Sequence, residues 1–318
     1  MASPQILITD NCDSMLIEGL HQMGFTVDYK PTILRADLFH CIDGYTGIII
    51  ATRILLDKKV LEQATTLKFI ARAGSGMENI DTEFAKSKNI ACINSPEGNA
   101  NSVGEHAMGL LLSIFHNITK SSFETQQMKW LVEENRVHEL EGKTIGIIGY
   151  GNTGKAFAKK LSVFGMNVFV YDRFLKNYSD RYGAEKTMAE IFQTAEIISL
   201  HVPLASDTEY LISLEYFDLF KKPIYIINTS RGRVINHSDL LQALKQGKVL
   251  GAALDVYENE KFETHSESER MIFEQLVHTG KVIFTPHIAG KSFESKKKIS
   301  LVLLEKIAAL SNSVKGLS

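Results

Sequence analysis

Short apolar runs rich in β-branched residues alternate with amphipathic stretches along the first third of the chain. Runs of this kind predict strands, whereas apolar positions at helical spacing predict helices. The run GIIIA at residues 47–51 is continuously apolar, which is typical of a strand that is buried on both faces. We expect strands at residues 6–9, 26–29, 47–51, 67–71 and 90–93, and helices at residues 14–23, 34–41, 58–64 and 81–87.

A different pattern occupies the middle of the chain. Apolar residues recur at helical spacing from residue 102 to 119, which predicts one long helix, and a polar segment at 120–142 follows with the only tryptophan, Trp130. The charged stretch 259–270 is expected to be an exposed loop. We expect further strands at residues 144–148, 167–171, 197–200, 225–228, 250–254 and 282–284, and further helices at residues 153–164, 188–193, 213–220, 238–246 and 293–310.

Two series of strands alternating with helices predict an α/β protein with two doubly wound parallel sheets. The length of 318 residues also suits two domains. The composition is that of an ordinary soluble protein, with 44% hydrophobic and 23% charged residues. A formal net charge of −2 removes the electrostatic case for a dedicated nucleic-acid or membrane-surface binder. No apolar run reaches the roughly 18 residues that a membrane-spanning helix needs.

The three cysteines and the N-terminus indicate a compartment. Cys12, Cys41 and Cys92 are widely spaced and form no CxxC motif, which argues against a disulfide framework or a zinc site and favours a reducing environment. The opening residues MASPQILITD lack the basic and apolar regions of a secretory signal. We therefore expect a cytoplasmic protein with no metal.

The strongest local motif is GYGNTG at residues 149–154, which follows a predicted strand and opens a predicted helix. In this context Gly149 permits a tight turn, Gly151 leaves room for a pyrophosphate, and Gly154 lets the helix pack closely on the strand. Asp172 ends the next strand, where a carboxylate accepts hydrogen bonds from a ribose diol and repels a 2′-phosphate. The motif predicts an NAD site, with NAD preferred over NADP.

Further motifs at family spacing make the chain resemble the D-isomer-specific 2-hydroxyacid dehydrogenase family, and within it the D-3-phosphoglycerate dehydrogenases. The resemblance spans nearly the whole chain, and its specificity comes from several ordered motifs rather than from one. The matching segments are residues 72–79 (RAGSGMEN), 101–108 (NSVGEHAM), 149–154 (GYGNTG), 201–204 (HVPL), 228–232 (NTSRG), 252–256 (AALDV) and 285–290 (TPHIAG).

The resemblance implies how the two domains are connected. A flavodoxin-like catalytic domain would combine residues 1–98 with residues 288–318, and a Rossmann NAD-binding domain at residues 99–287 would be inserted between them. The long helix at 102–119 would then form the contact of a homodimer. The chain ends soon after its last predicted helix, so we expect no C-terminal regulatory module of the kind that mediates serine feedback.

Three residues are the expected catalytic groups by family analogy and by charge. His287 would protonate the carbonyl oxygen during reduction, because the pKa of histidine lies near neutrality. Glu260 would orient His287 and favour its imidazolium form, although Lys261 replaces the proline that the family usually has next. Arg231 would hold the substrate carboxylate and polarise the carbonyl. His201 is a rival histidine, which the family places beside the cofactor.

Other roles are carried over from the family position by position. His106 lies on the predicted long helix and is interpreted as a packing residue. The expected cofactor contacts are Ser75, Gly149, Gly151, Asn152, Thr153, Gly154, Asp172, His201, Val202, Pro203, Thr229, Ser230, Asp255 and Gly290. The expected substrate contacts are Arg53, Arg72, Ser75, Gly76, Arg231 and His287.

Substrate choice depends on the arginines. Arg53 and Arg72 both follow apolar strands, and two guanidinium groups together with Arg231 suit a substrate that carries a carboxylate and a phosphate. This favours 3-phosphoglycerate, and therefore serine biosynthesis. A small acid such as glycerate, hydroxypyruvate or lactate is the alternative, whereas formate is disfavoured because its dehydrogenase has Gln where Glu260 stands.

A transcriptional corepressor that senses NAD is the alternative from another functional class. Such corepressors can keep the Arg, Glu and His residues of the family, so those residues alone do not decide between the two functions. Corepressors typically carry long disordered tails, and we expect none in this chain. The expected partners are a small anionic substrate and a second copy of the chain, with no nucleic acid and no membrane.

Overall fold

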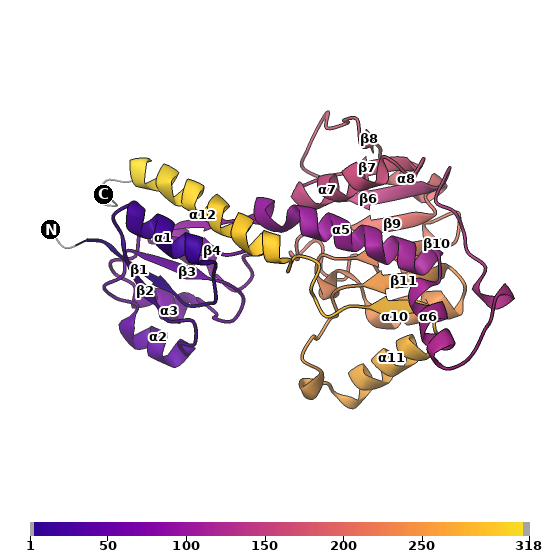
Figure 1. Cartoon of the computed structure of the whole chain (residues 1–318), viewed down its shortest axis with the longest axis horizontal. Coiled ribbons are helices and arrows are strands. Elements are labelled where there is room, and N and C mark those ends of the chain that lie inside the picture. Colours follow the sequence, from indigo (N-terminus) through magenta and orange to yellow (C-terminus); the bar gives the residue numbers. More distant parts are fainter. Residues whose placement is uncertain (1–2, 314–318) are drawn as a thin grey trace. The chain divides into compact units, whose positions relative to one another are not determined.

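The computed structural model describes residues 3–313, which fall into two compact units. Unit 1 combines the described residues up to Ala100 with those from Lys291 onward, and unit 2 comprises Asn101–Gly290. The chain therefore leaves unit 1, builds unit 2 and returns to unit 1 (Figure 1). The domain boundaries expected from the sequence, 98/99 and 287/288, lie two and three residues earlier than these.

Unit 1 is built on a five-stranded parallel sheet in the order β2-β1-β3-β4-β5, which is the flavodoxin-like order. All of its strands have four residues, close to the predicted positions. The strands are β1 (Gln5–Ile8), β2 (Thr26–Tyr29), β3 (Gly47–Ile50), β4 (Phe69–Arg72) and β5 (Ala91–Asn94). The helices are α1 (Ser14–Gln22), α2 (Arg35–Cys41), α3 (Lys58–Glu62), α4 (Thr82–Ser87) and α12 (Phe293–Ser313).

The continuous apolar run of β3 is explained by two cores, one on each face of this sheet. Ile48 and Ile50 pack with the apolar residues of α2, α3 and α4, whereas Ile49 points to the opposite face and packs with α1 and α12. Leu303 and Ile307 of α12 are completely buried in that second core. The last helix therefore belongs to unit 1 although it follows unit 2 in the sequence.

Unit 2 is built on a seven-stranded parallel sheet in the order β12-β11-β10-β9-β6-β7-β8. This is the Rossmann order with one additional strand, so the predicted fold class is confirmed. The strands are β6 (Thr144–Ile148), β7 (Asn167–Tyr171), β8 (Ala184–Glu185), β9 (Ile197–Leu200), β10 (Ile224–Asn228), β11 (Val249–Leu254) and β12 (Val282–Phe284). The helices after β6 are α7 (Asn152–Leu161), α8 (Met188–Thr194), α9 (Leu214–Asp218), α10 (His237–Lys245) and α11 (Glu267–His278).

The single helix predicted at 102–119 is wrong at both ends, because α5 (Pro96–Phe115) begins earlier and α6 (Ile118–Gln126) is separate. Proline is tolerated in the first turn of a helix, where its missing N–H would have no partner. Asn117 lies between the two helices with φ 48°, a left-handed conformation that asparagine adopts more readily than most residues. Among residues 3–313, no helix is long and apolar enough to cross a membrane.

The loop predicted at 259–270 is also wrong in its second half, where α11 begins. Ser266 and Glu269 form a reciprocal capping box, in which each side chain accepts a hydrogen bond from the backbone amide of the other residue. This motif satisfies two amides at the start of α11 that would otherwise have no partner. The high charge of the segment favoured a loop in the prediction, whereas the Ser-x-x-Glu capping pattern at Ser266 and Glu269 predicts the start of a helix.

Candidate active site

The glycine-rich turn follows β6 and leads into α7. Gly149 has φ +94°, and a Cβ atom at this position would lie 2.4 Å from the carbonyl oxygen of His201. A Cβ on Gly154 would lie 2.1 Å from the carbonyl oxygen of Gly149, so the helix approaches the turn more closely than any side chain would permit. Nothing lies within 4 Å of a Cβ built on Gly151. The turn therefore leaves an open position in front of the first amides of α7, which suits a pyrophosphate.

Asp172 follows β7 and holds this turn from the side. Its carboxylate accepts hydrogen bonds from the backbone amides of Tyr150 at 2.9 Å, Phe174 at 3.0 Å and Leu175 at 3.2 Å. The neighbouring Arg173 forms an ion pair with Asp207. A carboxylate thus lies beside the glycine turn, and the adjacent cation is already paired with another acid.

His201 follows β9, on the other side of the turn. Its Nδ1 lies 3.2 Å from the hydroxyl of Thr153, and its Nε2 lies 2.9 Å from the hydroxyl of Ser199. Burial lowers the pKa of His201 to about 4, so the ring is neutral at neutral pH. A neutral imidazole whose two nitrogens both lie at hydroxyl groups is a poor general acid at neutral pH. Val202 is half-buried and Pro203 is exposed after it.

The loop after β10 is shaped by Asn228. The side-chain oxygen of Asn228 accepts from the backbone amide of Ser230 at 3.0 Å and from its hydroxyl at 2.8 Å, and its amide group donates to the carbonyl oxygen of Arg231 at 2.9 Å. The hydroxyl of Thr229 is buried and has no hydrogen-bond partner among residues 3–313. A buried polar group without a partner is costly. It therefore suits a polar ligand group such as a carboxamide.

Asp255 follows β11 and is almost completely buried. Its Oδ1 accepts from the hydroxyl of Thr285 at 2.6 Å and from the amide of Ile288 at 2.9 Å, and its Oδ2 accepts from the amide of Ala289 at 2.8 Å. Burial alone would raise the pKa of Asp255, but these hydrogen bonds and one from His106 outweigh burial and lower it. The carboxylate therefore anchors the segment 285–289 from within the chain.

His287 is the central residue of that segment and follows β12. Its Nδ1 lies 2.9 Å from the carboxylate of Glu260, and its side chain is 38% exposed. Because a carboxylate accepts hydrogen bonds, Nδ1 carries the proton and Nε2 is the other ring nitrogen. Nε2 makes no hydrogen bond within the part of the chain that the structure describes. The residue has φ +53°, in the left-handed region.

Sheet topology brings these loops to one edge. The strands β12, β11 and β10 are neighbours and run parallel, so their carboxyl ends lie at the same edge of the sheet. Arg231 follows β10, Glu260 lies in the loop after β11, and His287 follows β12. The glycine turn and His201 follow β6 and β9 at the same edge, where the strand order reverses. This is where open α/β sheets bind their ligands.

Sequence reasoning missed a second histidine–glutamate pair in this region. The backbone amide and Nδ1 of His237 both lie within hydrogen-bond distance of Glu258, at 2.6 Å and 2.9 Å. The His237 ring is almost fully buried and lies 4.3 Å from the ring of Tyr257. Burial alone would raise the pKa of Glu258, but the bonds from His237 lower it. The pair fixes the loop that leads to Glu260, and an acid next to an aromatic residue after β11 was its only signal in the sequence.

Unit 1 carries the remaining predicted residues at the carboxyl ends of β3 and β4. The guanidinium group of Arg53 donates to the backbone carbonyl oxygens of Ile33 at 2.6 Å, Pro31 at 3.1 Å, and Thr9. Its Nε lies 3.7 Å from Asp10. The side chain that was expected to contact substrate is thus engaged by the loops around it.

Arg72 ends β4 and is buried, and its guanidinium group lies where a Cβ on Gly74 would be. The hydroxyl of Ser75 lies 3.0 Å from Asn99, and the side chain of Asn94 donates to the Ser75 carbonyl oxygen at 2.6 Å. Gly76 follows in the same loop. Gly290, the last of the predicted cofactor residues, ends unit 2.

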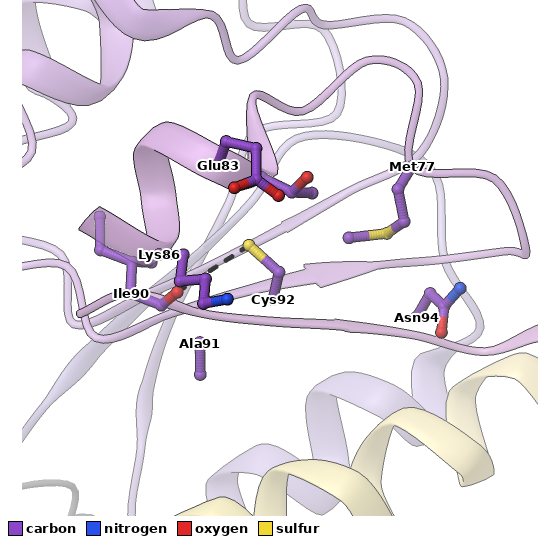
Figure 2. Close-up of a pocket in the computed structure, with 8 residues that line it drawn as sticks. Met77, Glu83, Lys86, Ile90, Ala91, Cys92 and Asn94 are labelled. Carbon is purple, nitrogen blue, oxygen red and sulfur yellow. Dashed lines mark hydrogen bonds between the residues drawn. The ribbon is translucent and has the colours of Figure 1, made fainter. Parts of the chain in front are cut away.

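A cavity of about 450 Å³ also lies in unit 1, between α4 and the edge strand β5 (Figure 2). Glu83 and Lys86 come to it from α4, and Cys92 comes from β5. Met77, which directly follows Gly76, lines it as well, but none of the site residues predicted from the sequence does. The cavity therefore borders the loop of Ser75 and Gly76 without being lined by either residue.

Residues 108–289 match the family model described as "D-isomer specific 2-hydroxyacid dehydrogenase, NAD binding domain". The chain is 31% identical over 315 residues to D-3-phosphoglycerate dehydrogenase of Archaeoglobus fulgidus, an alignment that covers 98% of this chain and 58% of the relative. It is 37% identical over 257 residues to hydroxypyruvate reductase of Thermotoga maritima, with 81% of each chain covered.

Solved structures agree with these relatives in fold. A glyoxylate reductase from Paecilomyes thermophila superposes with a TM-score of 0.86 at 24% identity, covering 99% of this chain and 97% of that one. The chain spans little more than half the length of the curated phosphoglycerate dehydrogenases it matches first, 58% and 56%. The family model and the Thermotoga relative, together with a glycine turn and an unpartnered Thr229 hydroxyl that fit the cofactor, confirm the resemblance. The chain belongs to the D-isomer specific 2-hydroxyacid dehydrogenase family and carries its NAD-binding domain.

Proposed function

We propose that this chain catalyses the NAD-dependent interconversion of a D-2-hydroxy acid and the corresponding 2-keto acid. The single observation that carries the proposal is the pair formed by His287 and Glu260, with 2.9 Å between Nδ1 and the carboxylate. The pair lies at the same sheet edge as the glycine turn of the NAD-binding domain. A histidine with one nitrogen fixed and the other accessible is suited to general acid–base catalysis.

In the direction of reduction His287 starts as the imidazolium, in which Nδ1–H is donated to Glu260 and Nε2 carries the proton that is transferred. In the direction of reduction this nitrogen gives a proton to the carbonyl oxygen, and in the direction of oxidation it takes one from the hydroxyl. Glu260 holds the ring by Nδ1 and keeps the orientation constant while the proton moves. The bound cofactor would supply the hydride as NADH in the direction of reduction and would accept it as NAD+ in the direction of oxidation.

Arg231 is proposed to hold the carboxylate of the substrate. It lies in the loop shaped by Asn228, and its neighbours Thr229 and Ser230 are the proposed contacts at the nicotinamide end. A guanidinium group binds a carboxylate through two parallel hydrogen bonds, which fixes the keto carbon relative to the acid. The other predicted cofactor contacts, from Gly149 to Asp255, are proposed in the same way.

3-Phosphoglycerate and 3-phosphohydroxypyruvate are the substrate pair that we propose first, which would give the chain a role in serine biosynthesis. Several of the matching curated relatives, including that of Archaeoglobus fulgidus, are named D-3-phosphoglycerate dehydrogenase. Within unit 2, Arg231 supplies the cationic group proposed for the carboxylate of such a substrate.

Hydroxypyruvate and glycerate are a second candidate pair, and one observation favours them. The guanidinium group of Arg53 donates to three backbone carbonyl oxygens of its own unit, which leaves it poorly suited to bind a phosphate. The Thermotoga maritima relative, which matches at the highest identity quoted above, is named hydroxypyruvate reductase.

We also propose that the chain forms a homodimer. The segment from α6 to residue 137 exposes large apolar side chains, among them Phe123, Met128 and Trp130, the last with 81% of its surface accessible. A contiguous segment of this kind is typical of a surface that a second protein covers. Sedimentation equilibrium tests this: Trp130→Glu should shift the protein toward monomer, whereas Val163→Glu, at an exposed site outside the segment, should not. An unchanged mass for Trp130→Glu would contradict the proposal.

We propose a cytoplasmic location because of the state of the cysteines. All three are free thiols in the structure, as expected in a reducing compartment.

A substrate panel tests the proposed activity. Purified protein is mixed with NADH and 3-phosphohydroxypyruvate, hydroxypyruvate, glyoxylate or pyruvate, and the loss of NADH absorbance is followed. The highest kcat/KM with 3-phosphohydroxypyruvate supports the first substrate pair, and the highest with hydroxypyruvate supports the second. Tight NADH binding without turnover of any keto acid would contradict the enzyme and favour a sensor of NAD such as a corepressor.

A further inference from the structure

One face of α5 is attached to the segment that carries His287. Ser102 and His106 lie one helical turn apart on α5, so their side chains lie on the same face. The hydroxyl of Ser102 donates to the carbonyl oxygen of Ala289 at 2.6 Å, and Nε2 of His106 lies 2.9 Å from the hydroxyl of Thr285. The helix therefore contacts the segment 285–289 at both of its ends.

The chemistry of Thr285 sets the direction of these hydrogen bonds. Its hydroxyl has one proton and lies 2.6 Å from Oδ1 of Asp255, a buried carboxylate that can only accept. Thr285 must then accept from its other neighbour, so Nε2 of His106 carries a proton and donates it. Nε2 of His106 is also 3.4 Å from the same carboxylate oxygen. The bonds run from His106 through Thr285 to Asp255.

Asp255 is the anchor of the segment that presents His287. Its carboxylate accepts from the amides of Ile288 and Ala289, and its backbone carbonyl oxygen accepts from the amide of His287 at 2.7 Å. His287 has φ +53°, a left-handed conformation that is uncommon and costly for a residue other than glycine, and the surrounding hydrogen bonds hold it there. The orientation of the carboxylate therefore determines whether the strained conformation is kept.

We propose that His106 is a positioning residue for the reaction: it orients Asp255 through Thr285, and so holds the backbone at His287 in the conformation that delivers the proton. This inference rests on the proposed function for its catalytic consequence. The helical periodicity that made His106 look like a packing residue describes its neighbours on α5, such as Ala107 and Leu111, which are fully buried in the core. His106 itself leaves that apolar face.

Two substitutions separate a positioning role from simple packing. His106→Leu keeps the volume approximately but removes the donor, whereas His106→Gln places an amide N–H near the position of Nε2. We expect His106→Leu to lower kcat by about tenfold with little change in the affinity for NADH, because small displacements of a catalytic group are costly. His106→Gln should recover most of kcat. Equal loss in both variants, or none in His106→Leu, would overturn the proposal.

A double-mutant cycle tests the route through Thr285. Thr285→Val removes the hydroxyl that links the histidine to the carboxylate. If the route is correct, adding His106→Leu to Thr285→Val lowers kcat little further. If the two substitutions lower kcat by factors that multiply in the double variant, His106 acts independently of Thr285. That result would overturn the proposed route.

Hydrogen exchange gives a readout that does not depend on turnover. The amides of His287, Ile288 and Ala289 all donate to Asp255, so they should be protected in the wild type and in His106→Gln but exchange at least several-fold faster in His106→Leu. His116→Leu, just beyond the end of α5, is the matched control and should change nothing. Unchanged exchange in His106→Leu would overturn the inference. Absent turnover in the wild type with the expected exchange pattern would instead contradict only the proposed function.

Discussion

The backbone amide of His287 donates to the backbone carbonyl oxygen of Asp255 at 2.7 Å, and the Asp255 carboxylate accepts from the two amides that follow His287. Asp255, which follows β11, therefore accepts hydrogen bonds from three consecutive backbone amides of the loop after β12. Asp255 therefore attaches His287, the proposed acid, to the sheet. The left-handed backbone of His287 is held by hydrogen bonds from its own amide and from the amides of Ile288 and Ala289.

Replacing this aspartate should destabilise the fold. Asp255→Asn exchanges one acceptor oxygen for an amide group, which cannot accept from Thr285 or from the backbone amides. We expect the free energy of unfolding to fall by about 1–3 kcal/mol, the usual cost of leaving a buried donor without a partner. Urea unfolding measures this. Asp218→Asn, which breaks an exposed pair with Lys248, is the control and should cost less than about 1 kcal/mol.

The stability deficit of Asp255→Asn is the difference in the free energy of unfolding between the wild type and this variant. Its pH dependence follows from the lowered pKa of Asp255. A carboxylate whose pKa is lower in the folded state stabilises the fold above its unfolded value of about 3.9, and this contribution is lost as the pH falls through the folded value. The deficit of Asp255→Asn should therefore be the same at pH 7 and pH 5. A deficit that disappears already at pH 5 would contradict the assignment of an ionised, hydrogen-bonded carboxylate.

His201 should make the protein less stable in mild acid. Burial lowers its pKa to about 4 in the folded chain, whereas an unfolded histidine titrates near 6.5. Between these values the unfolded chain binds a proton that the folded chain does not, so the free energy of unfolding falls with falling pH, by at most about 1.4 kcal/mol per pH unit. Unfolding at several pH values should show a shallower slope for His201→Gln. The exposed control His278→Gln should keep the wild-type slope, and an identical slope for both variants would contradict the assignment.

The ion pair between Arg173 and Asp207 should influence the choice between NAD and NADP. Arg173 follows Asp172 directly. Asp207 pairs with the guanidinium group of Arg173, which could otherwise bind a 2′-phosphate. Asp207→Asn should tighten NADPH binding about three- to fivefold, in line with the modest strength of exposed pairs, and leave NADH binding unchanged. Fluorescence titration measures both affinities. The double variant Arg173→Gln/Asp207→Asn should bind NADPH no more tightly than the wild type. An increased affinity for NADPH that persists in the double variant would mean that a residue other than Arg173 binds the 2′-phosphate.

Elements with regular periodicity were predictable, because the signal that forms them is local. The strands β6, β7, β9 and β12 have the predicted bounds, since each is an apolar run that ends at a polar or glycine residue. The split between α5 and α6 was missed because Asn117 interrupts the backbone without interrupting the apolar pattern. The helix α11 was missed because its first residues are charged and its stability begins with the capping box at Ser266.

The motifs indicate candidate site residues, but they do not indicate the contacts of those residues. Glu260 and His287 lie 27 positions apart, and only the adjacency of β11 and β12 brings them together. Asp255 was expected to contact the cofactor, and its hydrogen bonds with Thr285, Ile288 and Ala289 were not foreseen, because they depend on how the loop after β12 folds back. The carbonyl oxygens around Arg53 come from two loops, one after β1 and one after β2, which no local pattern reveals.

The most direct test of the proposed mechanism is the turnover of His287→Asn, measured with NADH and the best keto acid of the panel, beside a titration of NADH binding. We expect turnover to fall at least about 100-fold, because the proton donor is lost, while the affinity for NADH stays within about twofold of the wild type. The control His278→Asn, at an exposed position on α11, should behave as the wild type. Turnover of His287→Asn near the wild-type rate would contradict the role of His287 as the acid, and with it the proposed mechanism.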